Sequence, residues 1–243
     1  MDGKYGAYNY VSSATRIREI LDQPSGAFEE PDSLPDRSKL SYTNGFYSNC
    51  SAIFVDIRDS SGLTKRHTRP VLAKLYRSFI SEMVAVLNGS LNVREVNIVG
   101  DCVWAVYNTP YKSDIDNVFS TAAQANSLKD LLNGELKRKQ YENLKFGIGV
   151  EWGRALMIKA GYKGSGLNEV VYMGDVVNRA AHLAHEAGRQ WTHPIWVGES
   201  FAGNLNDHNQ SLLTKGYSAA MGSYRSGTVV NSAMNEWIAS TYK

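Results

Sequence analysis

Phe54-Val-Asp-Ile57 and Val99-Gly-Asp101 are the two phrases of the sequence that decide the fold. Each phrase places one aspartate at the end of an apolar run, a pattern that indicates a buried strand. The segment between the phrases has the spacing of one long amphipathic helix. Two carboxylates at neighbouring strand ends are what a two-metal phosphoryl-transfer site requires, so we predict that Asp56 and Asp101 bind metal.

The bulk composition limits the class of protein. The chain has 243 residues and a formal net charge of +2, which suits one large domain with an extension and demands neither a nucleic-acid nor a membrane partner. Its two cysteines, Cys50 and Cys102, lack C-x-x-C metal spacing and are too few for a disulfide scaffold. No apolar run reaches the roughly 18 residues of a membrane span, and no signal-peptide core is visible. We therefore expect a cytoplasmic location.

Hydrophobic periodicity and breaker residues divide the chain into an N-terminal helix and linker extension (1–45), a core domain (46–205) and a tail that completes the same domain (206–243). The order strand, helix, strand, strand, helix, strand predicts an α+β fold with the ferredoxin-like split βαβ plan. Strands are predicted over residues 50–57, 91–98, 102–107, 144–150, 155–160, 169–173 and 195–197, helices over 12–21, 68–87, 113–138 and 174–186, a loop over 58–62, a glycine-rich hairpin tip over 161–168, and weak strand signals over 212–243.

The loop that follows Asp56 has the composition of an anion-binding loop. Its residues are Arg58, Asp59, Ser60 and Ser61. Backbone N–H groups in such a loop, ahead of a helix, could cradle a phosphate. The loop lacks the Gly-x-x-x-x-Gly-Lys-Ser pattern of P-loop NTPases. Taken singly, Asp56 could also cap the next helix, and Asp101 could simply be a turn residue beside a glycine.

A third group of polar residues lies on the helix predicted over residues 174–186. Asn178 and His182 are four residues apart, and Arg179 and His182 are three apart, so they share one helix face. This spacing alone fits a solvated face at least as well as the wall of a pocket.

Four motifs in order make the chain similar to one known family. They are Phe54-Val-Asp-Ile57, Asn97-Ile-Val-Gly-Asp101, Gly147-Ile-Gly-Val-x-x-Gly153 and Met173-Gly-Asp-x-Val-Asn178-x-Ala-Ala. Together they resemble the catalytic core of class III nucleotidyl cyclases. The resemblance implies a ferredoxin-like core that works as a homodimer with active sites at the interface. It also implies a reaction in which the ribose 3′-oxygen attacks the α-phosphorus and diphosphate leaves.

The resemblance implies roles for individual residues by their position in the motifs. Asp56 and Asp101 match the two metal-binding aspartates of the family. The backbone carbonyl of Ile57 joins them at the second ion, which implies two Mn²⁺ or Mg²⁺ ions per active site. Asn178 matches the asparagine that orients the ribose from the other subunit.

Several positions depart from the family pattern. The lysine that reads a purine is replaced by Asn97, and the aspartate that reads adenine is replaced by Val171. The transition-state arginine is replaced by His182, which leaves His182 and Arg179 as candidates to supply that charge. Asp59 replaces a glycine and adds negative charge where phosphates are expected.

Loss of both purine readers with retention of both aspartates resembles one subgroup, the pyrimidine (uridylate) cyclases of the bacterial Pycsar antiphage system. Tyr42-Thr-Asn-Gly-Phe-Tyr47 and Gly227-Thr-Val-Val-Asn-Ser-Ala-Met-Asn-Glu-Trp237 are similar to that subgroup as well. The resemblance implies a cyclic UMP or cyclic CMP product that acts on a separate cyclic-nucleotide-responsive effector, with UTP favoured as substrate. Phe46 or Tyr47 could fill the space of the missing purine ring, or could simply pack over the sheet edge.

Two other interpretations stay open from the sequence. A cytidylate or purine cyclase with an altered pocket would keep the same metal ligands. A catalytically inactive domain that binds nucleotide or a partner would explain His182 and Asp59. Retention of both metal aspartates favours an active enzyme.

Overall fold

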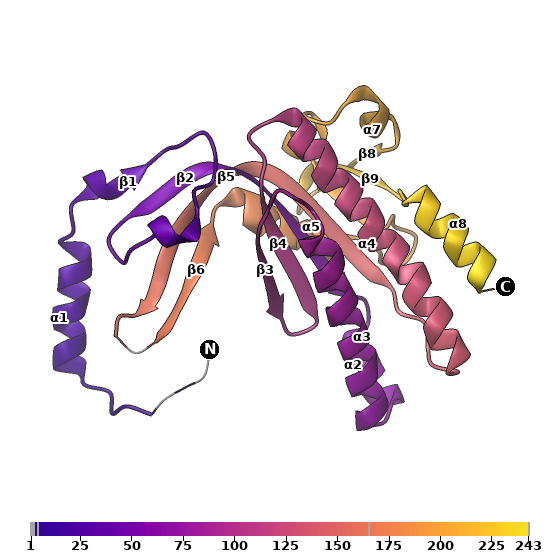
Figure 1. The fold of residues 1–243 in the computed structure, drawn as a ribbon, viewed down its shortest axis with the longest axis horizontal. Helices are drawn as coiled ribbons and strands as arrows, with labels where there is room; N and C mark the ends of the chain where they lie inside the picture. The colour runs from indigo at the N-terminus through magenta and orange to yellow at the C-terminus, as the bar shows by residue number, and fades with distance from the viewer. Residues whose placement is uncertain (1–2, 4, 165, 243) are drawn as a thin grey trace.

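The computed structural model describes residues 3, 5–164 and 166–242. Ser165, in the hairpin tip predicted over residues 161–168, lies outside the described part, as do residues 1, 2, 4 and 243 in the predicted extension and tail. One twisted sheet runs through the molecule, with the N-terminal helix beyond one end and the C-terminal helix beside the long helices at the other (Figure 1).

Strands and helices alternate through the first two thirds of the chain. The strands are β1 (Phe28–Glu29), β2 (Gly45–Ile57), β3 (Val93–Val99), β4 (Cys102–Asn108), β5 (Phe146–Tyr162), β6 (Leu167–Met173), β7 (Ile195–Gly198), β8 (Thr214–Ser218) and β9 (Gly222–Gly227). The helices are α1 (Tyr10–Leu21), α2 (Ser60–Arg66), α3 (Arg69–Asn88), α4 (Lys112–Arg138), α5 (Asp175–Glu186), α6 (Glu199–Ala202), α7 (Asp207–Ser211) and α8 (Ser232–Thr241), with 3₁₀ turns at Ser25–Ala27 and Arg37–Lys39.

The sheet has the strand order β3-β4-β2-β5-β7-β9-β8, and β6 pairs with the far part of β5. Strands β3, β4, β2 and β5 are joined by antiparallel ladders. Helix α3 connects β2 to β3, and α4 connects β4 to β5. This is the strand order of the split βαβ plan, so the predicted α+β ferredoxin-like fold is confirmed.

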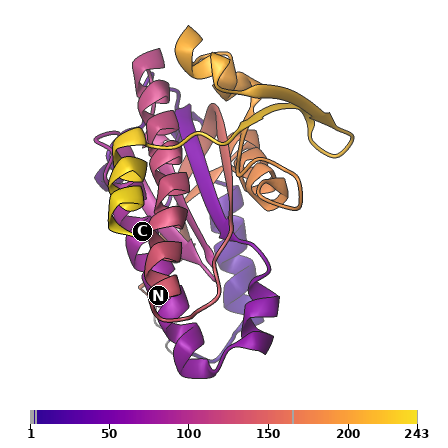
Figure 2. The same cartoon turned by 90° about the vertical axis from the view of Figure 1, so that its right-hand side faces the viewer.

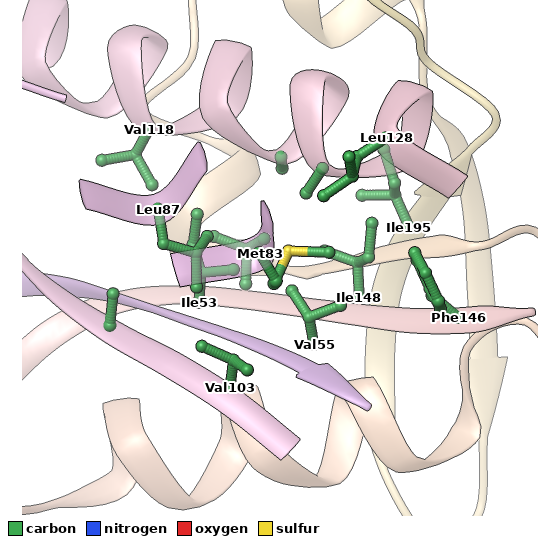
Figure 3. Packing of buried hydrophobic residues seen from close by; sticks show 14 of the residues in the cluster. Ile53, Val55, Met83, Leu87, Val103, Val118, Leu128, Phe146, Ile148 and Ile195 are labelled. Atoms are coloured by element: carbon green, nitrogen blue, oxygen red, sulfur yellow. The ribbon is translucent and has the colours of Figure 1, made fainter. Parts of the chain in front are cut away.

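One face of the sheet carries the main core. Ile53 and Val55 of β2 are fully buried, and so is Val103 of β4. They pack against α3 and α4, where Met83 is also fully buried (Figure 3). Because side chains alternate along a strand, Asp56 must point to the opposite face.

The opposite face is covered by α5, which lies across β5 from the long helices (Figure 2). The contact is close because β5 has glycine at two positions on this face. A Cβ at Gly149 would overlap the Ala180 carbonyl oxygen and the Ala184 amide nitrogen. A Cβ at Gly147 would overlap the carbonyl oxygens of Ala184 and Ala187. The glycine motif therefore sets the position of α5 over the sheet.

The structure differs from the prediction in four places. Strand β2 begins at Gly45, five residues earlier than predicted, and β5 is one continuous strand instead of two pieces. The loop predicted over residues 58–62 becomes helix α2 from Ser60, because Leu63 is buried and anchors it to the core. The tail forms the β8–β9 hairpin and also helix α8, which the pattern missed. Helix α8 has one buried residue, Ile238, so its apolar signal is weak.

Strand β9 pairs with β7, so the tail extends the same sheet that carries the core. Among the residues that the structure describes, no helix is long and apolar enough to cross a membrane.

Substitution of Gly149 tests the glycine contact. We expect Gly149→Ala to lower the free energy of unfolding by about 2–3 kcal/mol, because the added methyl meets backbone atoms of α5 that cannot rotate away. The measurement is chemical denaturation of both proteins. Gly153→Ala is the matched control, since it lies on the same strand and its Cβ would meet only Val176, at 3.6 Å. Equal stability of the two variants would contradict a tight α5 contact.

Candidate active site

Asp56 and Asp101 meet at one end of the sheet. Asp56 on β2 lies opposite Cys102 on β4, the residue after Asp101. Asp101 belongs to the two-residue turn between β3 and β4, where Gly100 has a φ of +62° that glycine adopts without steric cost. The structure therefore brings together the two aspartates that the sequence singled out.

An arginine from the same loop contacts the first aspartate. The guanidinium of Arg58 lies 2.5 Å from the Asp56 carboxylate, and the Arg58 side chain is only 9% exposed. It also donates to the backbone carbonyl of His185, at the C-terminal end of α5. The absence of a side chain at Gly147 leaves the space that the guanidinium fills.

The two aspartates and Arg58 influence one another electrostatically. Burial raises the pKa of the Asp56 carboxyl above its usual value, and the negative charge of Asp101 adds to that rise while Arg58 opposes it. Burial also lowers the pKa of Arg58, which Asp56 opposes. A half-buried carboxylate with a second carboxylate beside it requires a cation, and Arg58 supplies one positive charge.

The donor set fits hard divalent cations. The carboxylates of Asp56 and Asp101 are oxygen ligands of the kind that Mg²⁺ and Mn²⁺ prefer, and the carbonyl of Ile57 is an adjacent oxygen. Across residues 3, 5–164 and 166–242, no group of three or more His, Cys, Asp or Glu side chains gathers as a metal centre. Any ion here would thus take its remaining ligands from water or from a bound substrate.

The predicted phosphate loop forms the start of α2. Asp59 is in the left-handed conformation, with φ of +55°, and Ser60 and Ser61 make the first turn of the helix. The Asp59 carboxylate pairs with Arg66 at 2.9 Å, so its negative charge is partly neutralised.

A hollow of about 950 Å³ lies beside the N-terminal half of α5. Asn178, Arg179 and His182 line it, so this helix face borders a hollow and is more than a solvated surface. Its other walls come from β5, the start of α6 and the β8–β9 hairpin. Asp56 and Asp101 are not among its lining residues, so one chain holds the two groups of predicted site residues apart.

Arg179 and His182 differ in their surroundings. The Arg179 Nε atom lies 2.8 Å from a carboxylate oxygen of Glu151, a residue that the sequence analysis missed. The His182 side chain is exposed and, within the described part of the chain, forms no hydrogen bond or ion pair. A charged residue two places after Gly149, on the same face of β5, was the signal that could have identified Glu151.

The three predicted base-pocket residues lie apart in one chain. Asn97 lines a smaller hollow of about 330 Å³ next to β3. Tyr47 lines the larger pocket, where Arg154 stacks on its ring. Val171 pairs with Ile158, so it faces away from the side of the sheet that carries Tyr172, Met157 and Asp56.

The sequence profile of the adenylate and guanylate cyclase catalytic domain matches residues 43–216. The chain belongs to this family. Two relatives are named uridylate cyclase. The one from Treponema porcinum is 38% identical over 95% of this chain and 81% of its own length. The one from Gulbenkiania mobilis is 37% identical over 98% of both chains. The predicted family is confirmed.

Solved structures of cyclases have the same fold. The guanylyl cyclase Cya2 gives a TM-score of 0.63 at 12% identity, covering 77% of this chain and 95% of its own. The adenylyl cyclase CyaB from P. aeruginosa gives 0.63 at 18% identity over 78% and 97%. A class III adenylyl cyclase-like ATP-binding protein from Pseudomonas aeruginosa gives 0.69 at 17% identity over 91% and 48%. At these identities the likeness shows the fold of a cyclase.

Family membership gives the two aspartates a chemical context. Class III cyclases use divalent metal ions and typically act as dimers on a nucleotide. In this cyclase Arg58 holds the Asp56 carboxylate at the position where a metal ion would bind. The Arg58 guanidinium pairs with one oxygen of this carboxylate. Its positive charge would therefore oppose a metal ion that approaches the same oxygen, and we predict that the two cations compete.

Metal binding by an Arg58 variant tests this competition. We expect Arg58→Gln to tighten Mn²⁺ binding, measured by electron paramagnetic resonance without nucleotide, by on the order of tenfold. The reason is that a charge-assisted hydrogen bond worth about 1.5–3 kcal/mol no longer has to be broken.

Arg189→Gln is the matched control for this experiment. Arg189 also donates to the His185 carbonyl, but its ion pair is with Glu186 and not with Asp56, so we expect a smaller change in Mn²⁺ affinity. Weaker Mn²⁺ binding in Arg58→Gln than in the wild type would show that Arg58 orients Asp56 for the metal instead of competing with it.

Proposed function

We propose that this cyclase converts UTP to 3′,5′-cyclic UMP and diphosphate. The observation that carries the proposal is that two relatives named uridylate cyclase match nearly the whole chain at 37% and 38% identity. The meeting of Asp56 and Asp101 at one sheet end supports an active enzyme, since both carboxylates that the chemistry needs are present and adjacent.

The proposed reaction is an intramolecular substitution at the α-phosphorus. The ribose 3′-hydroxyl gives up its proton to solvent, and a bond forms from its oxygen to the α-phosphorus. The bond from that phosphorus to the bridging oxygen breaks, and diphosphate leaves. Asp56, Asp101 and the Ile57 carbonyl hold two Mn²⁺ or Mg²⁺ ions. When bound, these ions lower the pKa of the 3′-hydroxyl and neutralise charge on the phosphates. Arg58, once displaced from Asp56, contacts the triphosphate together with the backbone of Ser60 and Ser61 at the start of α2.

The remaining residues act from the partner subunit in the proposed homodimer. Asn178 orients the ribose, and His182 lies one turn further along the same face of α5. The separation of the α5 pocket from the two aspartates in one chain supports a site assembled from two chains, because a single chain does not complete it.

In this proposal the base is selected by the absence of both purine-reading residues of the family. Asn97 and Val171 occupy the positions of the two purine-reading residues and carry neither their charge nor their length. Tyr47 lines the larger pocket, where its ring takes up part of the space that a purine would need in this proposal. We propose that the cyclase works in the cytoplasm during antiphage defence and that its product acts on a separate cyclic-nucleotide-responsive effector, as the likeness to the Pycsar subgroup implies.

A second candidate function is nucleotide binding without turnover. The cyclase-like ATP-binding protein from Pseudomonas aeruginosa, with a TM-score of 0.69, favours it. The ion pair between Arg58 and Asp56 favours it too, since Arg58 then lies where a metal ion would bind Asp56. Cytidylate and purine cyclase activities are further alternatives within the enzyme class.

A panel of the four ribonucleoside triphosphates with Mn²⁺ tests the main proposal. We expect cyclic UMP from UTP as the dominant product, identified by mass spectrometry, and background rates for Asp56→Ala and Asp101→Ala because each removes a metal ligand. Asp22→Ala is a suitable control, since Asp22 follows α1 and lies outside the matched region 43–216. Cyclic AMP, cyclic GMP or cyclic CMP as the dominant product would show that UTP is not the preferred substrate. No turnover of any nucleotide would favour the function of nucleotide binding alone.

Mixed subunits test the shared active site. A chain with Asp56→Ala and a chain with Asn178→Ala are each expected to be inactive alone. Mixed dimers contain one intact composite site, so we expect partial recovery of the rate. Heterodimers proven by mass spectrometry that stay inactive would contradict a site shared between subunits.

A further inference from the structure

Glu151 is a buried charge in an unusual place on the sheet. It lies on β5 between the part that pairs with β7 (148–150) and the part that pairs with β6 (156–162). Its side chain is only 5% exposed. A Cβ at Gly198 would overlap the Glu151 carboxylate, so the absence of a side chain at Gly198 leaves the space that this carboxylate fills. A buried carboxylate is costly unless its oxygens are paired.

Both carboxylate oxygens of Glu151 have partners. One oxygen accepts from the backbone N–H of Trp152 at 3.0 Å and from that of Phe201 at 3.1 Å. The other lies 2.8 Å from Arg179 Nε. The carboxylate thus joins β5, the short helix α6 and the guanidinium of α5. Among the described residues, Arg179 is the cation that pairs with it.

Arg179 makes a further contact across the pocket. Its terminal Nη2 atom donates to the carbonyl of Ser223 on β9, at 2.5 Å. One guanidinium therefore ties α5 to the interior of the sheet and to the hairpin that forms the facing wall of the 950 Å³ pocket. Asn178 precedes Arg179 in the chain, and His182 lies one turn beyond it on the same helix.

We propose that Glu151 and Arg179 are a positioning pair that fixes the α5 face carrying Asn178 and His182 against the β8–β9 hairpin. Arg179 is then not the group that contacts the transferring phosphate. To reach a phosphate it would have to leave a carboxylate that is almost fully buried and has no other cation. His182, whose side chain is exposed, stays available to the substrate. This inference rests on the proposed function, because that function places Asn178 on the ribose.

Kinetics of three variants separate positioning from direct contact with the substrate. We expect Glu151→Gln and Arg179→Gln each to lower kcat by about 10- to 100-fold, with a smaller change in KM, because a displaced Asn178 misaligns the reacting oxygen. The double variant should be no worse than either single one, because both remove the same contact. A normal kcat in Glu151→Gln, with a low kcat in Arg179→Gln, would overturn the proposal and make Arg179 a catalytic residue.

A matched ion pair provides the control. Arg225, on the same strand as Ser223, has Nε 3.5 Å from Glu199 on α6 and donates to the Gln210 side chain on α7, so its polar partners lie on helices other than α5. Arg225→Gln should therefore leave kcat close to the wild-type value. Arg179→Lys keeps the charge but cannot span both partners with one rigid fork, so its kcat should lie between those of Arg179→Gln and the wild type.

Hydrogen–deuterium exchange keeps the test independent of turnover. In Glu151→Gln we expect faster amide exchange both in α5 and in the β8–β9 hairpin, and no change in α3. Unchanged exchange in α5 and the hairpin would refute the positioning role even if the wild type turned over no nucleotide. An inactive wild type would defeat the proposed function alone, so the two failures are distinguishable.

Discussion

The close packing of α5 on β5 is the constraint on which both groups of site residues depend. Gly147 and Gly149 let the helix backbone rest against the strand where any side chain would overlap it. At this distance the C-terminal carbonyl of His185 reaches Arg58, and the middle of the helix brings Arg179 to Glu151. A helix held further away would release both guanidinium groups. The glycine motif thus acts through backbone packing, without any contact to a ligand.

Two carboxylates on this face have similar partners and different accessibility. Asp56 and Glu151 are each paired with an arginine, and burial raises the pKa of both. The Asp56 side chain is 27% exposed at the open end of the sheet, whereas that of Glu151 is 5% exposed beneath α5. In the proposed function the first carboxylate exchanges its arginine for a metal ion, whereas the second stays paired with Arg179 beneath α5. The same chemistry therefore gives one exchangeable contact and one fixed contact.

Much of the fold could be predicted because its signals are local. The apolar runs that end at Asp56 and Asp101 identified β2 and the β3–β4 hairpin, and the position of each aspartate at the end of its run predicted that the two lie at one end of the sheet. The tail gave only weak strand signals, which the β8–β9 hairpin accounts for, and helix α8 was missed, because these elements carry few buried residues. Glu151 was missed for a related reason. The role of Glu151 depends on its pairing with Arg179, and the two residues meet only after α5 has folded onto the sheet.

The pairing of charges also explains how one chain can keep an incomplete site folded. Asp56 and Asp101 concentrate negative charge at a sheet end, and Arg58 offsets part of it from within the same loop. On the other wall, Glu151 holds the Arg179 guanidinium that would otherwise point into the pocket. Each half therefore has its own counter-charge before any metal, nucleotide or second subunit is present. In the proposed mechanism, assembly of the site displaces Arg58 from Asp56, while the α5 face that meets the ribose is already held by the pairing of Glu151 with Arg179.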